Sequence, residues 1–212
     1  MEVIDLSHMI VPDMPVYPGM EQPVMESACC IEKNGFWEKK ITIYSHTGTH
    51  MDAPAHIIPG AATLDTLPVS HFCGTACVVD VATISGNRIE RSMLLPHEQT
   101  IREVDFLVIR TGWDRYWGMD RYFVDYPVLT VEAAEWLGKC MLKGIGIDAI
   151  SVDDTDSHHF PVHRALLKAD TVIIENLTDI GKIPGGVFFI SCFPLRLDNA
   201  DGSPVRAVAF LQ

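Results

Sequence analysis

The chain of 212 residues is long enough to bury a substantial hydrophobic core without disulfides or a structural metal. Its composition, 48% hydrophobic and 21% charged, is typical of a soluble globular protein. The net charge of −12 argues against nucleic acid and anionic membranes as partners, because binding phosphate groups requires an excess of lysine and arginine.

Nothing in the sequence predicts a membrane segment or a secretory signal. The chain begins MEVIDLSHMI, which lacks a basic region followed by a hydrophobic run. No hydrophobic run approaches the roughly 18 residues that span a bilayer. We therefore expect a cytoplasmic protein. Its six cysteines are scattered without CxxC spacing, which predicts free and mostly buried thiols: Cys29, Cys30, Cys73, Cys77, Cys140 and Cys192.

The elements expected in chain order are mostly short strands rich in β-branched residues. The predicted strands are Val3–Leu6, Val24–Ile31, Trp37–Tyr44, Ala76–Val81, Phe106–Arg110, Gly146–Ile150, Thr171–Glu175, Val187–Ser191 and Val205–Leu211. One helix is predicted from Val131 to about Leu142, with Thr130 as its N-cap and Gly144 as its stop. Shorter helices are expected at 92–99 and 163–168. The sequence thus predicts an α/β protein with a strand-rich core and one domain, residues 1–212.

The segment "SHTGTHMDAPAH", residues 45–56, concentrates three histidines and an aspartate. Its glycine and proline argue against a helix. The spacings of His46, His50, Asp52 and His56 are all even, so an extended chain would direct these four side chains toward one side. Imidazole and carboxylate ligands without thiolates suit Zn²⁺ or Mn²⁺. The alternative is a polar turn whose side chains only satisfy backbone groups.

A second ionisable cluster lies in "DDTDSHHFPVHRALLKADTVIIENLTDI". Of His158, His159 and His163, we expect one to be a ligand. Glu175 ends the hydrophobic run "TVIIE", where a carboxylate is either a ligand or ion-pair partner, or marks a strand end that has reached water. Asp153 either orients a ligand imidazole or is a solvated carboxylate.

These motifs resemble the cyclase family, whose best-known members are bacterial kynurenine formamidases (arylformamidases). "HTGTHMDAPAH" resembles the family signature HxGTHxDxPxH. "IDLSHMIVPDMPVYPG", "LVIRTGWDRYWG", "HRALLKADTVIIENL" and "DGSPVRAVAF" are similar to other blocks of the family, in the same order. The resemblance spans nearly the whole chain. It implies a swivelling β/β/α fold and a homodimer or homotetramer.

The resemblance also implies a site with one or two ions of zinc or manganese. The residues that match its metal ligands are His46, His50, Asp52, His163 and Glu175. Asp52 and Glu175 match carboxylates that bridge two ions, and His56 matches the general acid/base. In the implied reaction, hydroxide formed on the metal attacks the carbonyl of a small amide, and His56 protonates the leaving nitrogen.

One position departs from the kynurenine formamidase pattern. The family carries tryptophan before Pro–Gly, and this chain carries Tyr17, which we expect to contact the substrate. The change leaves open whether the substrate is an aryl formamide such as N-formylkynurenine or a cyclic amide such as isatin. Alternatives are a lactone or ester hydrolase that uses the same site, and a non-catalytic metal- or ligand-binding protein of the same fold.

Three further residues have two interpretations each. Trp113 and Trp117 in "GWDRYWG" either line a substrate pocket or, as is commoner for aromatic residues after a strand, belong to the core or an interface. Arg206 either binds substrate or forms a structural ion pair, and we expect the ion pair.

Overall fold

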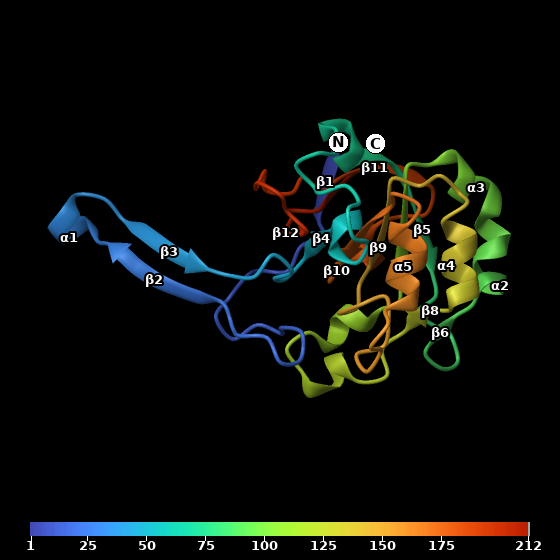
Figure 1. Ribbon diagram of the computed structural model, residues 1–212, viewed down its shortest axis with the longest axis horizontal. Helices are drawn as coiled ribbons and strands as arrows, with labels where there is room; N and C mark the ends of the chain where they lie inside the picture. The colour runs from blue at the N-terminus through green and yellow to red at the C-terminus, as the bar shows by residue number, and fades with distance from the viewer. Residues whose placement is uncertain (212) are drawn as a thin grey trace.

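The centre of the molecule is a nine-stranded mixed sheet. The structure, a computed structural model, describes residues 1–211. The strand order is β1-β13-β11-β5-β7-β9-β10-β4-β12, and the four neighbouring strands β5, β7, β9 and β10 are parallel. Antiparallel strands extend this parallel core on both sides (Figure 1). The α/β, strand-rich fold class predicted from the sequence is confirmed.

The elements are short, as expected. The strands of the large sheet are β1 (Glu2–Asp5), β4 (His50–Asp52), β5 (Cys73–Asp80), β7 (Phe106–Arg110), β9 (Gly144–Ile147), β10 (Val172–Glu175), β11 (Val187–Ser191), β12 (Gly202–Pro204) and β13 (Val208–Leu211). Two small sheets pair β2 (Val24–Cys29) with β3 (Glu38–Thr42), and β6 (Arg88–Ile89) with β8 (Val128–Leu129). The α-helices are α1 (Ile31–Asn34), α2 (Arg91–Leu94), α3 (Glu98–Glu103), α4 (Val131–Leu137) and α5 (Pro161–Leu167).

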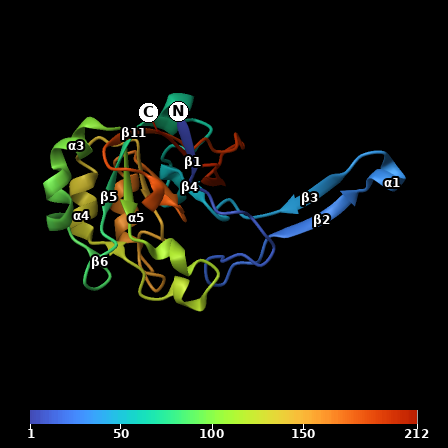
Figure 2. The same ribbon diagram turned by 180° about the vertical axis from the view of Figure 1, so that it is seen from behind.

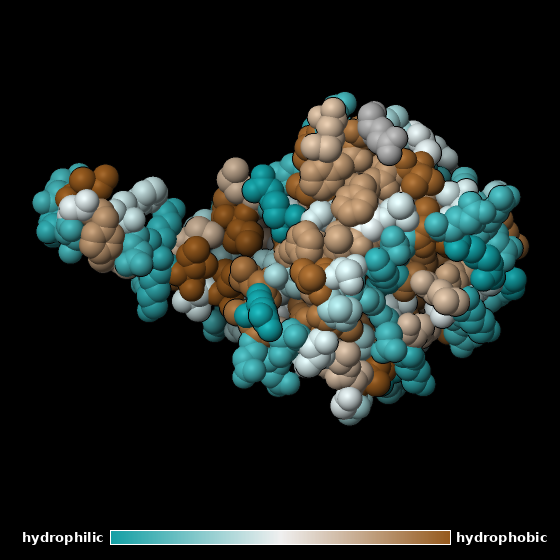
Figure 3. Space-filling model, turned by 90° about the horizontal axis from the view of Figure 1, so that it is seen from above, coloured by the Kyte–Doolittle hydropathy of each residue, from teal (hydrophilic) through white to brown (hydrophobic). Residues whose placement is uncertain are grey.

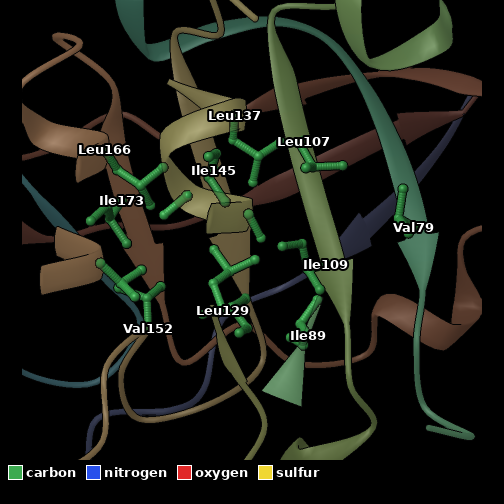
Figure 4. Close-up of a cluster of buried hydrophobic side chains, with 14 of the residues drawn as sticks. Val79, Ile89, Leu107, Ile109, Leu129, Leu137, Ile145, Val152, Leu166 and Ile173 are labelled. Carbon is green, nitrogen blue, oxygen red and sulfur yellow. The ribbon is translucent and has the colours of Figure 1, made fainter. Parts of the chain in front are cut away.

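Each face of the parallel strands packs a hydrophobic core. In β7, Leu107 and Ile109 point into one cluster and Phe106 and Val108 into the other, because side chains alternate along a strand. The first cluster lies under α4 and α5, where Leu137 packs near Ile145 (Figure 4). This two-sided burial explains why the central strands read as continuous hydrophobic runs. Burial on both faces also holds the ends of these strands in place, and the polar residues of the site lie at those ends.

The helix predicted at 131–142 begins as expected and ends early. The Thr130 hydroxyl accepts a hydrogen bond from the Ala133 backbone N–H at 3.2 Å, which confirms the N-cap. The helix ends at Leu137, and Gly144, predicted as its stop, is the first residue of β9. A Cβ added at Gly138 would lie 3.2 Å from the Ala165 carbonyl oxygen, so α5 packs closely against this position.

All nine predicted strands correspond to observed strands, with shifts at their ends. Phe106–Arg110 and Val187–Ser191 match at both ends. The segment predicted to start at Val205 forms a strand only from Val208. The short strands β4, β6, β8 and β12 are not among the nine predicted strands, because two or three residues give too little alternation to recognise. Both shorter predicted helices are also found: α2 and α3 overlap residues 92–99, and α5 overlaps residues 163–168.

A hairpin arm projects from this body. The arm comprises β2, α1 and β3, residues 24–42, and it extends away from the large sheet in both views (Figure 1, Figure 2). Its strands pair with each other and with no other strand of residues 1–211. Within the same residues, no helix is long and hydrophobic enough to cross a membrane.

Candidate functional site

The histidine-rich segment reaches the site through turns and not as one extended strand. Gly48 has a positive φ of 67°, only His50–Asp52 form a strand, and Pro54 begins a 3₁₀ turn that includes His56. The expectation that even spacing along an extended segment aligns the four side chains is therefore wrong for its two ends. The side chains still converge, because the turns fold both ends back toward β4.

Strand pairing brings the two halves of the site together. β4 runs antiparallel to β10, and in this register His50 lies opposite Glu175. His50 and Asp52 are two residues apart in the strand, so both side chains share one face of the sheet. His163 comes from the third position of α5, which packs beside β10. Residues more than a hundred positions apart thus meet at one buried point.

Asp52 lies between two groups of candidate ligands and directs one oxygen toward each. Its Oδ1 is 2.7 Å from His46 Nδ1 and 3.3 Å from His50 Nε2. Its Oδ2 is 3.6 Å from His163 Nε2. The side chain of Asp52 is 1% exposed. This carboxylate is placed to be shared by two cations.

Glu175 likewise directs one carboxylate oxygen toward each of two histidines. Its Oε2 is 3.5 Å from His50 Nε2, and its Oε1 is 3.4 Å from His163 Nε2. Oε1 also accepts a hydrogen bond from the Val152 backbone N–H at 3.0 Å, which orients the carboxylate. Glu175 is buried. Of the two interpretations of this strand end, the one in which the carboxylate simply reaches water is therefore excluded.

Every candidate histidine ligand has a fixed acceptor on its other ring nitrogen. His46 Nε2 lies 3.0 Å from Asp201 Oδ2, and His50 Nδ1 lies 2.8 Å from the Gly48 carbonyl oxygen. His163 Nδ1 lies 2.8 Å from Asp153 Oδ2. Such acceptors select the tautomer and hold the ring in place, as around metal-binding histidines in general. They leave Nδ1 of His46 and Nε2 of His50 and His163 directed toward the shared carboxylates.

Asp153 is a buried orienting group and not a solvated carboxylate. Besides the His163 ring, it accepts hydrogen bonds from the backbone N–H groups of Val162 and His163, each at 3.0 Å. These are unpaired donors of the first turn of α5, so the carboxylate also caps the helix. One side chain therefore fixes both the helix start and the imidazole that the helix carries.

The histidines and carboxylates of the cluster stabilise one another in their charged forms. Burial alone lowers the pKa of His46, but Asp52 and Asp201 outweigh it and raise that pKa to about 9. Burial is likewise outweighed at His50, whose pKa rises to about 10. Conversely, burial raises the pKa of Asp52, but the surrounding histidines hold it well below its usual value. Two buried carboxylates must be neutralised by protons on the histidines or by a bound cation.

The donor set fits a metal ion. Three groups of three residues have ligand atoms within 4.8 Å of one another, and two of them, His46–His50–Asp52 and Asp52–His163–Glu175, share Asp52. Nitrogen and carboxylate donors without thiolate suit zinc or manganese. Two such groups that share one carboxylate provide places for one or two ions.

His56 lies beside this cluster and belongs to neither of the two groups that share Asp52. Its ring centre is 4.1 Å from that of His46, and its Nδ1 is 3.5 Å from Asp201 Oδ2. Burial lowers the pKa of His56, which keeps its imidazole neutral at neutral pH. A neutral imidazole can accept a proton on one nitrogen while the other carries one.

A cavity of about 390 Å³ opens above these residues. Its floor is polar, and its walls are largely hydrophobic and aromatic; wall residues include Pro15, Val16, Tyr17, Met20, Tyr44, Ile150 and Phe160. Tyr17 donates a hydrogen bond from its hydroxyl to the Thr155 carbonyl oxygen at 3.3 Å, which ties the wall to the loop that follows β9. The size and lining suit a small molecule with an aromatic or aliphatic body.

The three residues for which the sequence left two interpretations, Trp113, Trp117 and Arg206, have structural roles. Trp113 is buried in the first core cluster, and Trp117 stacks on His8 with ring centres 3.8 Å apart; neither lines the 390 Å³ cavity. Arg206 forms an exposed ion pair with Asp5, in agreement with the expected structural role. All six cysteines, which lie within the described residues, are free, and Cys77, Cys140 and Cys192 are buried.

Asp201 is the site residue that sequence reasoning missed. It precedes β12, whose Gly202 lies opposite Asp52 in β4, and this pairing brings the carboxylate to His46 and His56. His46, His56 and Asp201 also place ligand atoms within 4.8 Å of one another. An aspartate before glycine, as in "DGSPVR", is typical of a turn and does not by itself indicate a site residue. The only signal in the sequence that could have identified Asp201 was its position in a block that resembles the family.

Comparison with known proteins identifies the family of this chain. The sequence profile described as "Putative cyclase" matches residues 4–154. A kynurenine formamidase of Bacillus thuringiensis (strain Al Hakam) is 32% identical over 212 residues, covering 98% of this chain and 96% of the relative. A cyclase-like protein 2 of Oryza sativa subsp. japonica is 29% identical over 97% of this chain and 78% of the relative.

Solved structures share the fold over almost all of the chain. An isatin hydrolase bound to the product analogue thioisatinate superposes with a TM-score of 0.89 at 24% identity, covering 99% of this chain and 92% of the other. A predicted metal-dependent hydrolase from Bacillus stearothermophilus superposes with a TM-score of 0.81 at 29% identity, over 98% and 97% of the two chains. By sequence and fold, this chain belongs to the cyclase family.

Proposed function

We propose that this protein is a metal-dependent hydrolase that cleaves the C–N bond of a small aryl amide, either an aryl formamide such as N-formylkynurenine or a cyclic amide such as isatin. The observation that carries the proposal is the arrangement around Asp52. Two groups of nitrogen and oxygen donors share this buried carboxylate, and a histidine outside both groups faces the same cavity. The names of the relatives support this reaction class.

In this proposal His46, His50, Asp52, His163 and Glu175 hold one or two ions of zinc or manganese. When bound, the metal supplies a Lewis acid that activates water at neutral pH and polarises the carbonyl of the substrate. The protein's own contribution is to fix the donors. Asp201, the Gly48 carbonyl and Asp153 hold the three rings, so the lone pairs that bind the metal are aligned before it arrives.

His56 is the proposed general acid/base. Because burial lowers its pKa, the neutral ring can take a proton from the attacking water and return it to the leaving nitrogen. Asp201 lies 3.5 Å from its Nδ1, which leaves Nε2 as the nitrogen that exchanges protons with the substrate. This division of roles resembles other sites in which a carboxylate orients a catalytic histidine.

The cavity walls favour an aromatic substrate. Tyr17, Tyr44 and Phe160 all line the cavity, and aromatic rings bind planar groups through stacked and edge-on contacts. Tyr17 stands where kynurenine formamidases carry tryptophan. A smaller ring with a tethered hydroxyl leaves more room at this wall, so we propose that it sets which aryl amide is accepted.

Two alternatives make different predictions. A lactone or ester hydrolase would use the same ligands and His56, and would cleave an aryl ester faster than the matching amide. A non-catalytic binding protein would hold metal without turning over either. The position of His56 favours an enzyme, because its ring lines the cavity beside the two donor groups that share Asp52 and belongs to neither of them.

The test combines metal analysis with a substrate panel. Protein purified without chelator is assayed for zinc and manganese, stripped, and reloaded with each metal; initial rates are then measured on N-formylkynurenine, isatin, an aryl formamide and its aryl formate counterpart. We expect activity on an amide that is lost on stripping and restored by one of the two metals. Asp52→Ala should lose metal and activity together, whereas Asp156→Asn, an exposed carboxylate on the loop before α5, should lose neither. Absence of bound metal in the wild-type protein would overturn the proposal.

A further inference from the structure

The cavity above the candidate metal ligands has no basic side chain in its lining. The residues that line it, which all belong to the described part of the chain, include neither lysine nor arginine. The chain has 28 aspartates and glutamates and only 16 lysines and arginines, and this excess of negative charge extends into the cavity. Apart from a cation bound at the floor, the cavity therefore offers no lysine or arginine with which an anionic group of a substrate could pair.

Four carboxylates line the cavity, and three of them belong to the histidine cluster at its floor. Asp52 and Glu175 are buried among the histidines, and Asp201 Oδ2 lies 3.0 Å from His46 Nε2. Protonated imidazoles or a bound cation balance the negative charge of these three. Glu21 is the fourth carboxylate; it is exposed and forms no ion pair with any of residues 1–211. It is thus the one charged residue of the lining that lies outside the cluster.

A turn in the loop before the hairpin arm places Glu21 at the mouth of the cavity. The Met20 backbone N–H donates a hydrogen bond to the Tyr17 carbonyl oxygen at 3.0 Å, and Gly19 has a positive φ of 91°. Proline followed by glycine at the centre of such a turn is typical of type II. Met20 is 53% exposed, and Figure 3 shows a hydrophobic patch where the arm joins the body. Because Met20 and Glu21 both line the cavity and both reach solvent, they mark its opening.

The position of Glu21 determines which part of a substrate it can meet. A substrate whose amide lies at the candidate ligands places its body along hydrophobic walls such as Val16 and Ile150, and directs its far end toward the mouth. The charge that this end encounters is that of Glu21. A carboxylate attracts a cation and repels an anion, and both effects are stronger beside a cavity than in open water. The net charge of −12 also attracts cations to the protein as a whole.

We propose that Glu21 is a substrate-binding residue, and that it selects aryl amides that carry a cationic amine at the end remote from the scissile bond. The ammonium group pairs with the Glu21 carboxylate at the mouth, while the amide lies at the floor. An anionic aryl amide of the same size is repelled, and a neutral one leaves this carboxylate unpaired. The inference rests on the proposed hydrolase function and narrows its substrate class by charge.

The test measures how the charge of a substrate affects its hydrolysis by the metal-loaded protein. Three formanilides carry an aminomethyl, a hydroxymethyl or a carboxymethyl group at the same ring position, so they are cationic, neutral and anionic at neutral pH. The wild-type protein should show its highest kcat/KM on the aminomethyl compound and its lowest on the carboxymethyl compound. Glu21→Gln should lower the ratio of these two values about 2–30-fold, because one attraction and one repulsion, each a factor of about 1.4–5 at an exposed site, are both lost.

Two further variants of Glu21 and two controls test whether the effect depends on charge at this position. Glu21→Lys should reverse the order of the three compounds, and Glu21→Asp, which keeps the charge, should retain it. The matched controls are Glu32→Gln and Glu32→Lys, which make the same charge changes at an exposed glutamate of the hairpin arm, outside the cavity lining. Both controls should leave the ratio at its wild-type value.

Binding without turnover separates this inference from the proposed function. Ligand-observed NMR measures the dissociation constants of the same three compounds for the protein as purified, and these should follow the same order and respond to the same variants. Ordered binding without hydrolysis would contradict the hydrolase function and still support Glu21 as the residue that binds the ammonium group. A wild-type protein that does not favour the aminomethyl compound in rate or in binding overturns the inference. A preference that persists in Glu21→Lys, or that changes equally in Glu32→Lys, also overturns it.

Discussion

Replacing Asp153 by asparagine tests how much of the site depends on the groups behind its ligands. The substitution keeps the size of the side chain and removes its charge. The wild-type carboxylate accepts three hydrogen bonds, from the Val162 N–H, the His163 N–H and His163 Nδ1, at 3.0, 3.0 and 2.8 Å. An asparagine amide has only one oxygen. Its NH₂ group must therefore face at least one of these donors.

The magnitude follows from that geometry. If the asparagine oxygen stays with His163, the Val162 N–H loses its buried acceptor, which costs about 1–3 kcal/mol of folding free energy. If it stays with Val162, His163 Nδ1 faces a donor, and the ring loses the tautomer that directs the Nε2 lone pair toward Asp52 and Glu175. Loss of such a partner typically lowers metal affinity by about 10–100-fold, which is about 1.4–2.7 kcal/mol.

The assay is competition between the protein and a chelator for the metal, together with thermal unfolding of the metal-free protein. We expect Asp153→Asn to bind metal 10–100-fold more weakly and to unfold at lower temperature. Asp156→Asn, which changes an exposed carboxylate three residues away, controls for the change in net charge. Metal affinity equal to that of the wild-type protein in Asp153→Asn would refute the reasoning that this carboxylate sets the tautomer of His163.

Three further outcomes are expected. His56→Ala should retain its metal and lose about 10²–10⁴-fold in kcat; full activity of this variant on a confirmed substrate would exclude the acid/base role. Gly202→Ala should weaken metal binding about tenfold or more, because an added Cβ lies 2.5 Å from Cε1 of His46, a ring held on both sides by carboxylates; chelator competition measures it, and unchanged affinity would show that the ring can move freely. The metal-free protein should lose stability as pH rises: the folded pKa of His46, about 9, exceeds its ordinary value of 6.5, so the contribution is fully present below about pH 6.5 and is lost as pH passes through about 9. Thermal unfolding of the metal-free protein across this interval measures the effect, and a flat profile would contradict the protonated cluster.

The arrangement of the core was readable from the sequence because burial leaves a periodic signal. Phe106–Arg110 and Val187–Ser191 were predicted to the residue, since both are continuous hydrophobic runs bounded by polar positions. Thr130 was identified as an N-cap because capping depends on one hydroxyl and the local backbone. The helix end was not: α4 ends at Leu137, and Gly138 follows it as the C-cap.

The candidate ligands were also identified from the sequence, because their residue types and the family-like motif mark them. The even spacing used to align them was only part of the reason for their convergence. A turn at Gly48 and a 3₁₀ turn at Pro54 fold the ends of the segment inward. The register of β4 with β10 then sets His50 opposite Glu175. That register depends on long-range strand pairing, which leaves no local trace in the sequence.

The strand-rich α/β core, the start of α4 and the residue types of a metal site could all be predicted from the sequence, because each depends on local chemistry or periodic burial. The tertiary structure alone decided three other features. It brought Asp201 to His46 through the pairing of β12 with β4, and it showed Asp153 as the buried partner of His163. It also revealed an arm whose exposed tip has no partner within its own chain among residues 1–211. All three depend on which distant segments become neighbours, and only the folded chain specifies that.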